Sequence, residues 1–321
     1  MGVDTPTEVV ETGVSSLRRR LEKLPDNHPA SPNYDRDKRA GQVDGVRPLT
    51  DAEHAEHVAD VRARLDEARK AGLATHLTFT VDAKHRIWSD ERDALHDEIV
   101  AELYSRAESV PRESCAILAG GLPGSGKTTV LSEHAGIDLS QYLMINPDVI
   151  KEEMASRELI PEVDGLSPME ASDLVHEETS LIAKRLAHRA QADGTNLIWD
   201  VTMSDQKSTT RRIDDLRDAG YTQVDGIFVD IPVDVSLRRA DARHREGHEQ
   251  YRNGLGFGGR YAPPEIIVDQ ADPELGSQNR RIFESLKGRF DSWQRYDNSV
   301  DRRAPVIVEM GTGDPRERSS A

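Results

Sequence analysis

The sequence predicts an α/β domain from about residue 112 to 312, with a doubly wound, mostly parallel sheet, preceded by a mainly helical N-terminal extension. Three observations support this fold class. Short apolar runs recur in this part of the chain, helical stretches separate them, and a glycine-rich loop directly follows the first run. The runs cover residues 115–120, 141–146, 195–202, 224–231 and 304–310. Strands that are apolar on both faces and alternate with helices form parallel sheets covered on both sides.

The sequence pattern before residue 112 predicts helices outside this domain. Apolar residues at spacings of three and four indicate a short helix within residues 5–24. Thr50 precedes a helical stretch that Gly72 closes, residues 76–88 look extended, and Ser89 begins a second helix. The predicted division is an arm or linker at 1–50, a helical extension at 51–111 that packs on the core, the α/β domain at 112–312 and a loose tail at 313–321.

Charge and composition exclude several classes of protein. Asp and Glu outnumber Lys and Arg by 58 to 42, which gives a net charge of −16. Nucleic acids and anionic membranes attract clustered basic residues, so neither is an expected partner. The single cysteine, Cys115, cannot form an internal disulfide. No stretch approaches the ~18 apolar residues of a membrane span. Because the chain also begins without a secretory signal pattern, we expect a cytoplasmic protein.

The strongest motif is GLPGSGKT, residues 121–128, which satisfies the phosphate-loop pattern G-x-x-x-x-G-K-[ST], or Walker A. It lies between an apolar run and a helical stretch, the context that this motif requires. Lys127 is expected to reach the β- and γ-phosphate oxygens of ATP, and the Thr128 hydroxyl to bind Mg²⁺. The residues expected to bind the nucleotide are Gly121, Pro123, Gly124, Ser125, Gly126, Lys127, Thr128 and Thr129.

Two aspartates follow predicted strands, where ligands of doubly wound sheets bind. Asp148 follows the second strand, and there a carboxylate can accept the proton of an acceptor hydroxyl; alternatively, it only begins the next helix. Asp200 ends the third strand and can hold Mg²⁺ or orient the acceptor; alternatively, it is a solvated loop residue. Thr202, just beyond, is a further candidate for contacting the acceptor.

An arginine-rich helix and a glycine-rich loop follow the fourth strand, within residues 233–263. Guanidinium groups bind two phosphate oxygens at once, so this arrangement predicts a lid over a triphosphate. Surface ion pairs are the alternative explanation for the helical arginines. That alternative is weaker for Arg260, which lies in a loop rich in Gly and Pro.

Histidines recur in the front part of the chain, and His54 and His57 stand three apart on a predicted helix. No Cys/His spacing typical of a zinc site accompanies them. Exposed helical histidines are therefore the preferred interpretation.

Taken together, residues 112–275 resemble the zeta toxin family of P-loop kinases. The matching pieces are GLPGSGKT, Asp148 with Lys151 three residues later, the strand NLIWD followed by Thr202, and the two lid arginines. The resemblance implies a sheet of the P-loop kinase type. It also implies ATP as phosphoryl donor and UDP-N-acetylglucosamine, phosphorylated at the sugar 3′-hydroxyl, as acceptor. Family members are restrained by an antitoxin whose helix blocks the nucleotide site.

The resemblance implies a role for each matching residue. Asp148 takes the place of the general base, Lys127 that of the phosphate-loop lysine, and Arg243 and Arg260 those of the lid arginines. Glu177 or Glu178 corresponds to a helical glutamate that contacts the acceptor sugar, with Glu178 our choice. Asn146 and Pro147 replace the family's acidic pair ahead of the base, and Asp200 replaces a glutamate. A fused, self-inhibitory N-terminal segment is the alternative to a separate antitoxin.

The leading hypothesis is a Mg²⁺-dependent kinase that transfers the γ-phosphoryl group of ATP to a hydroxyl of a small acceptor, foremost a nucleotide sugar. Asp148, Lys127, Arg243 and Arg260 would carry catalysis, and Thr128 and Asp200 would hold the metal. A kinase for an antibiotic, another small molecule or a nucleotide is one alternative. A nucleotide-dependent regulator that does not catalyse transfer is the other.

Overall fold

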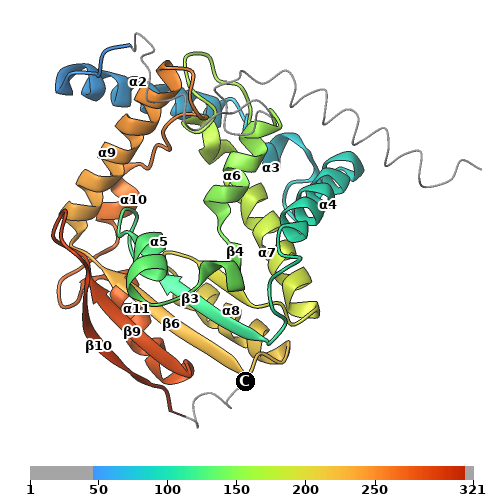
Figure 1. Ribbon diagram of the computed structural model, residues 1–321. Coiled ribbons are helices and arrows are strands. Elements are labelled where there is room, and N and C mark those ends of the chain that lie inside the picture. Colours follow the sequence, from blue (N-terminus) through green and yellow to red (C-terminus); the bar gives the residue numbers. More distant parts are fainter. Residues whose placement is uncertain (1–45, 315–321) are drawn as a thin grey trace, which may run out of the picture.

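A six-stranded sheet forms the centre of the molecule (Figure 1). The computed structural model describes residues 46–314. The strand order is β10-β9-β6-β3-β5-β4, and every neighbouring pair except β10–β9 is parallel. The strands are β3 (Cys115–Gly120), β4 (Leu143–Ile145), β5 (Leu197–Asp200), β6 (Gln223–Asp230), β9 (Ser292–Asp297) and β10 (Val306–Thr312). The predicted fold class, a mostly parallel sheet with flanking helices, is confirmed.

Helices alternate with these strands, as the apolar runs predict. The longer ones are α6 (Pro147–Ser156), α7 (His176–Ala192), α8 (Gln206–Asp218), α9 (Val233–Arg252) and α11 (Gln278–Leu286). The shorter elements are α5 (Lys127–Thr129), the π-turn η2 (Val130–His134), the 3₁₀ turns η3 (Leu139–Gln141), η4 (Ala171–Val175) and η5 (Lys287–Arg289), helix α10 (Pro264–Val268), and the hairpin of β7 (Ala271–Asp272) and β8 (Gly276–Ser277).

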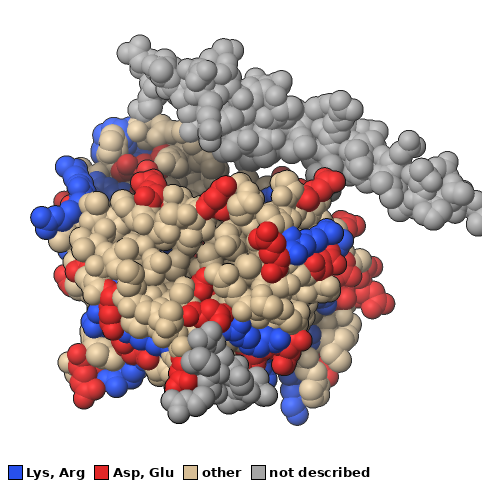
Figure 2. Space-filling model, turned by 60° about the horizontal axis from the view of Figure 1, so that its bottom comes forward, with Lys and Arg blue, Asp and Glu red and all other residues tan. Residues whose placement is uncertain are grey.

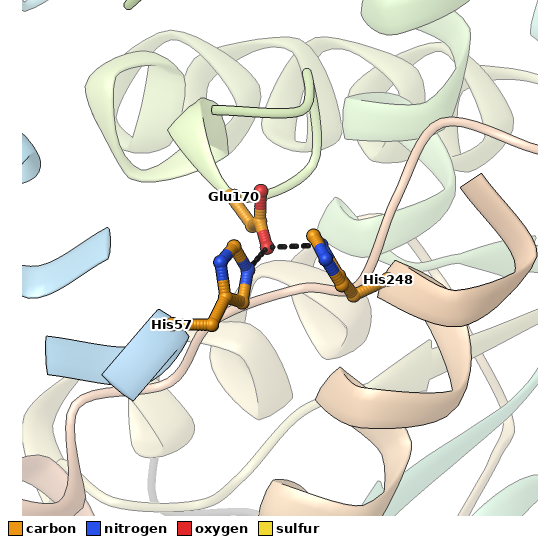
Figure 3. A group of neighbouring side chains, drawn as sticks. All are labelled: His57, Glu170 and His248. Carbon is orange, nitrogen blue, oxygen red and sulfur yellow. Dashed lines mark hydrogen bonds and ion pairs between the residues drawn. The ribbon is translucent and has the colours of Figure 1, made fainter. Parts of the chain in front are cut away.

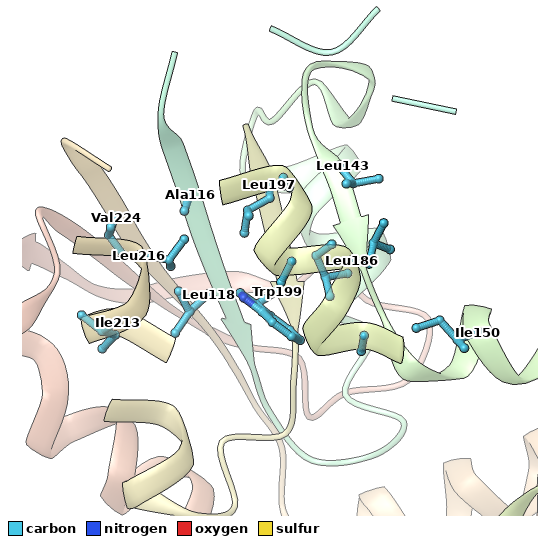
Figure 4. Packing of buried hydrophobic residues seen from close by; sticks show 14 of the residues in the cluster. Ala116, Leu118, Leu143, Ile150, Leu186, Leu197, Trp199, Ile213, Leu216 and Val224 are labelled. Atoms are coloured by element: carbon cyan, nitrogen blue, oxygen red, sulfur yellow. The ribbon is translucent and has the colours of Figure 1, made fainter. Parts of the chain in front are cut away.

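Alternate residues of β3 pack into different apolar clusters on the two faces of the sheet. Ala116 and Leu118 join the large cluster that includes Trp199 and residues of α7 and α8 (Figure 4). Ile117 and Ala119 join a second cluster with the π-turn η2. Burial on both faces explains why this run lacks the polar alternation of a half-exposed strand.

The last two strands differ from the sequence prediction. The run at 304–310 resembles the buried strands, but β10 is an antiparallel edge strand on which Val306 and Met310 are 56% and 62% exposed. The β-branched residues of β10 therefore favour a strand but do not indicate that the strand is buried. The polar strand β9 was not predicted, because only Tyr296 in it is buried. It pairs with β6 and carries β10 at the edge of the sheet.

The two predicted helices of the front part are present. Helix α2 (Asp51–Lys70) is capped by Thr50, which forms a capping box with Glu53, and α4 (Asp90–Ser105) is capped by Ser89. Between them lie a short helix, α3 (Thr75–Thr78), and a hairpin of β1 (Thr80–Asp82) and β2 (Ile87–Trp88). The segment predicted as extended is thus partly helical.

These front helices contact separate parts of the α/β core. On α2, Val61 and Leu65 pack with Leu174 and Tyr261, and α2 lies beside α9 in Figure 1. Helix α4 packs along α7. Three predicted features lie outside the described residues: the helix within 5–24, most of the arm at 1–50 and most of the tail at 313–321. The proposed division of the chain therefore stays a prediction. Within 46–314, no helix is long and apolar enough to cross a membrane.

Candidate active site

The phosphate loop, residues 121–128, joins β3 to α5 and requires glycine at specific positions. Gly121 and Gly126 have φ values of 142° and 82°. A Cβ on Gly121 would lie 2.4 Å from the Val229 carbonyl oxygen, and one on Gly126 would lie 2.6 Å from Asn298 Nδ2. Only glycine fits this backbone without displacing its neighbours.

Side chains from distant segments hold the carbonyl groups of the loop. Asn298 Nδ2 donates to the Ser125 carbonyl oxygen at 2.7 Å, and Ser236 Oγ donates to the Pro123 carbonyl oxygen at 2.7 Å. Arg239 donates to the Gly124 carbonyl oxygen at 3.2 Å. The outer side of the loop is therefore fixed by α9 and by the residue that follows β9.

The donors of the loop remain available to an anion. The backbone amides of Gly124, Gly126 and Lys127 donate to no group within residues 46–314. The Ser125 hydroxyl is buried and also lacks a partner among these residues. A buried donor without a partner is rare in proteins, and the three free amides beside the Ser125 hydroxyl belong to the same loop, which indicates a site for phosphate oxygens.

Lys127 and Asp200 form the centre of the candidate site. Lys127 Nζ lies 3.5 Å from Asp200 Oδ1 and donates to the Gly121 carbonyl oxygen at 3.2 Å. Asn146 Nδ2 donates to the other oxygen of Asp200 at 2.9 Å. Burial raises the pKa of Asp200 above its ordinary value, and the ammonium group of Lys127 opposes that shift. Both strand ends, β4 and β5, thus contribute to one polar cluster.

Asp148 lies in the first turn of α6, beside this cluster. The Asn146 side-chain oxygen caps the helix by accepting from the Asp148 amide at 2.8 Å. The Asp148 carboxylate accepts a hydrogen bond from Arg260 and lies 3.9 Å from Lys151 Nζ. Burial and the neighbouring Arg260 lower the pKa of Lys151 to about 8. The two alternatives considered for Asp148, helix start and site residue, are therefore compatible.

Other predicted residues lie at the rim. Arg243 is exposed on α9, and its charge acts on the ionisation of Asp200. Thr128 and Thr129 are exposed in α5. Thr202 is exposed just beyond β5, where its hydroxyl donates to Ser204 Oγ at 3.0 Å.

Glu178 is not brought to this cluster. Its side chain is 0% exposed, and its carboxylate accepts hydrogen bonds from Arg92 at 2.6 and 3.0 Å and contacts His96 Nε2 at 2.6 Å. Burial disfavours the charge, but His96 and Arg92 hold the pKa of Glu178 below its ordinary value. The neighbouring Glu177 pairs with Arg86 at 2.7 Å. In this structure Glu178 joins α4 to α7.

Sequence reasoning missed several contributors to the cluster. Asn146 stood out only as a departure from the family pattern, although a residue before a proline at the start of a helix is a recognisable N-cap. Asn298 and Ser236 support the phosphate loop from segments more than a hundred residues away. No local pattern marks them, since only the fold brings them to the loop.

Comparison with known proteins identifies the family. The sequence profile described as "Zeta toxin" matches residues 101–297. The crystal structure of the AvrRxo1-ORF1:-ORF2 complex with ATP is 17% identical, with a TM-score of 0.54, and the match covers 71% of this chain and 69% of that one. The same complex with sulphate ions gives 17% identity and a TM-score of 0.53, covering 71% of this chain and 72% of that one.

A third similar structure is the PezAT toxin–antitoxin system of Streptococcus pneumoniae, which is 19% identical, with a TM-score of 0.49 and coverage of 70% of this chain and 81% of that one. None of the curated protein sequences is a significant match. The likeness to these solved structures shows the fold alone. The profile, however, spans more than half of the sequence, and the chain therefore belongs to the zeta toxin family of P-loop kinases.

Proposed function

We propose that the protein transfers the γ-phosphoryl group of ATP to a hydroxyl of a small acceptor, foremost a nucleotide sugar such as UDP-N-acetylglucosamine. The observation that carries the proposal is the convergence of two pairs. Lys127 and Asp200 meet at 3.5 Å, and Arg260 contacts Asp148 in the first turn of α6, just beyond the neighbouring strand β4. Lys127 serves the nucleotide, Asp148 serves the acceptor, and Arg260 serves both.

The nucleotide side of the site supplies donors and positive charge. The unpaired amides of the phosphate loop and the Ser125 hydroxyl surround the phosphates, and Lys127 neutralises charge on the β- and γ-phosphates. Pro123 and Thr129 complete the binding segment. Arg243 and Arg260 bind oxygens of the transferred group, because a guanidinium group contacts two of them at once.

The donor set also fits Mg²⁺. The exposed Thr128 hydroxyl and the Asp200 carboxylate are hard oxygen ligands of the kind that Mg²⁺ prefers. Thr128 and Asp200 would hold Mg²⁺ there, and the ion would supply positive charge against the phosphates. The Asn146 contact fixes the orientation of the Asp200 carboxylate.

The acceptor side rests on Asp148. Its carboxylate takes the proton of the attacking hydroxyl, and Arg260 and Lys151 hold the carboxylate in place from two directions. Thr202 and Asp200 lie at the end of β5, where they can contact the acceptor. The identity of the acceptor as a nucleotide sugar rests on the family.

We further propose that a partner restrains the activity by covering the nucleotide site. In the family an antitoxin covers the nucleotide site, and a separate antitoxin is the first candidate here. The alternative is that the segment before residue 51 of the same chain covers it. The AvrRxo1 protein of similar fold was crystallised as a two-component complex. To distinguish these sources of inhibition, the full chain and a variant that lacks residues 1–50 are purified, and each is examined for a copurifying protein and for ATP-dependent transfer.

The test is a transfer assay with Mg²⁺, ATP and UDP-N-acetylglucosamine, followed by mass spectrometry, for the wild type, Asp148→Asn and Lys127→Met. We expect a phosphorylated sugar nucleotide from the wild type alone, with ATP binding retained in Asp148→Asn. Asp234→Asn, an exposed aspartate of α9, is the matched control and should keep full activity. If the protein phosphorylates other hydroxyl compounds instead, such as aminoglycosides or nucleosides, the assignment of a nucleotide sugar as the acceptor is wrong. Equal ATP turnover in all variants would refute the kinase mechanism.

A further inference from the structure

Three histidines surround one buried carboxylate at the junction of α2, α9 and the turn before η4. Glu170 Oε1 lies 2.6 Å from His57 Nε2, 3.1 Å from His248 Nδ1 and 3.1 Å from His244 Nε2. Figure 3 shows the His57 and His248 rings pointing at this oxygen from different helices. Neither His54 nor His57 is exposed, so the preferred interpretation of these histidines from the sequence is wrong.

Within residues 46–314, the charge of Glu170 has no Lys or Arg partner. The side chain is 0% exposed, and its ion pairs within residues 46–314 are with the three histidines, with no Lys or Arg among them. A buried carboxylate requires a compensating cation nearby. Imidazolium groups or a metal ion are the two cations that fit here.

The second oxygen of the carboxylate is fixed separately. Ser167 donates to Glu170 Oε2 through its backbone amide at 2.8 Å and through its hydroxyl at 2.7 Å. Among the described residues, Oε1 is therefore left to the three rings. Ligating carboxylates in metal sites are oriented by hydrogen bonds of this kind.

We propose that this cluster is a site for Zn²⁺ or a chemically similar transition metal ion. The candidate ligand atoms of His57, Glu170 and His248 all lie within 4.8 Å of one another, and His244 Nε2 approaches the same oxygen. Two imidazole nitrogens and one carboxylate oxygen, with a fourth position open to water, make a ligand set that suits tetrahedral Zn²⁺. At bond lengths of ~2.0–2.2 Å, tetrahedral ligands stand roughly 3.3 Å apart. His248 Nδ1, at 3.1 Å from Glu170 Oε1, is close to that spacing, and His57 Nε2, at 2.6 Å, has to move away by about 0.7 Å.

The site would join two parts of the chain that differ in role. His57 belongs to α2, which precedes the segment matched by the family profile, whereas His244 and His248 belong to α9. Helix α9 also carries Arg243 and leads into the loop of Arg260. A bound metal ion fixes this arginine-bearing helix to the front part of the chain and stabilises the fold without entering the phosphoryl transfer.

The experiment measures Zn²⁺ directly on the full chain. Protein stripped with a chelator and dialysed is titrated with Zn²⁺, and the bound metal is counted by mass spectrometry of the element. Co²⁺ serves as a spectroscopic probe, because tetrahedral nitrogen and oxygen ligation gives intense visible absorption. Thermal unfolding of the same samples reports the stabilisation.

We expect one Zn²⁺ per chain, a tetrahedral Co²⁺ spectrum, and an unfolding midpoint that rises by several degrees with metal. His57→Gln and His248→Gln should each lose this binding at least about tenfold, and Ser167→Ala should weaken it by about tenfold through the loss of orientation. His54→Gln is the matched control, because His54 belongs to the same helix and the same interface but its imidazole pairs with Asp241 and not with Glu170. It should bind Zn²⁺ normally.

Two results would overturn the proposal. One is the absence of stoichiometric Zn²⁺ and Co²⁺ binding by the wild type, with an unfolding midpoint that is unchanged by chelator; the cluster would then be neutralised by protonated histidines. The other is binding that His57→Gln and His248→Gln leave intact. The Co²⁺ spectrum of the wild type keeps the test decisive even where a variant fails to fold.

Discussion

Lys127 Nζ of the phosphate loop lies 3.5 Å from Asp200 Oδ1 at the end of β5, and the side chains are only 13% and 11% exposed. The charge that is to neutralise phosphate thus also neutralises a buried carboxylate. When a nucleotide phosphate binds the ammonium group of Lys127, that group carries its charge between the phosphate and the Asp200 carboxylate. Binding of the nucleotide and ionisation of Asp200 are therefore coupled.

Lys127→Met should abolish transfer and weaken ATP binding at least about tenfold. It also leaves Asp200 buried without its cation, which should destabilise the fold by about 1–3 kcal/mol. The double variant Lys127→Met/Asp200→Asn should recover that stability but not the activity. Chemical unfolding and ATP titration measure both effects. Equal stabilities of the single and double variants would contradict the coupling.

Arg260→Lys should lower kcat by about 10²-fold while changing the dissociation constant of ATP little, because a lysine cannot bind two oxygens in one plane. Arg260 also contacts Asp148, so the KM for the acceptor should rise. Arg238→Lys on α9 is the matched control, since Arg238 pairs with Asp301 at the surface. Steady-state kinetics give kcat and the KM for the acceptor of both variants. An equal fall of kcat in Arg238→Lys would contradict a specific role of Arg260.

The protonation of Lys151 should make stability depend on pH. Its pKa in the folded chain is lowered from 10.5 to about 8, so the folded state binds fewer protons than the unfolded state between these values. Stability therefore rises with pH in this window, by up to about 1.4 kcal/mol per unit.

Unfolding of the wild type and Lys151→Met by denaturant at about pH 7 and about pH 9.5 measures this dependence. The difference between the two proteins isolates Lys151 from other groups that titrate. Lys151→Met should be the more stable at the lower pH relative to the wild type, and the gap should narrow as the pH rises. A constant gap would show that Lys151 titrates at its ordinary pKa.

Glu178→Ala should destabilise the fold by about 3–5 kcal/mol, because it leaves Arg92 and His96 buried without their acceptor. Glu177→Ala is the adjacent control, whose ion pair with Arg86 is half-exposed and should contribute under about 1 kcal/mol. Thermal or chemical unfolding compares them. Similar losses for both would contradict the role of Glu178 as the link between α4 and α7.

The sequence predicted the fold and the phosphate loop because their signals are local. Apolar runs such as CAILAG and the glycines of GLPGSGKT carry their structural meaning within a few residues. The neighbourhood of Asp148 and Asp200 was also predictable, because parallel strands end at one edge of the sheet.

The remaining features depend on contacts between distant segments. Glu178 was expected near the acceptor, but which face of α7 receives Arg92 and His96 is decided by the packing of α4. Likewise, His57 and His248 stand far apart in the sequence, and no spacing relates them. Only the packing of α2 against α9 brings them to Glu170.

The most direct measurement follows the γ-phosphoryl group of ATP by phosphorus NMR, with UDP-N-acetylglucosamine present, for the wild type and Asp148→Asn at saturating ATP. Asp148→Asn must bind ATP as the wild type does. We expect a new phosphomonoester signal that appears with ADP in equal amounts in the wild type and is lost in Asp148→Asn. Release of inorganic phosphate alone, at the same rate in both proteins and whatever acceptor is offered, would contradict it.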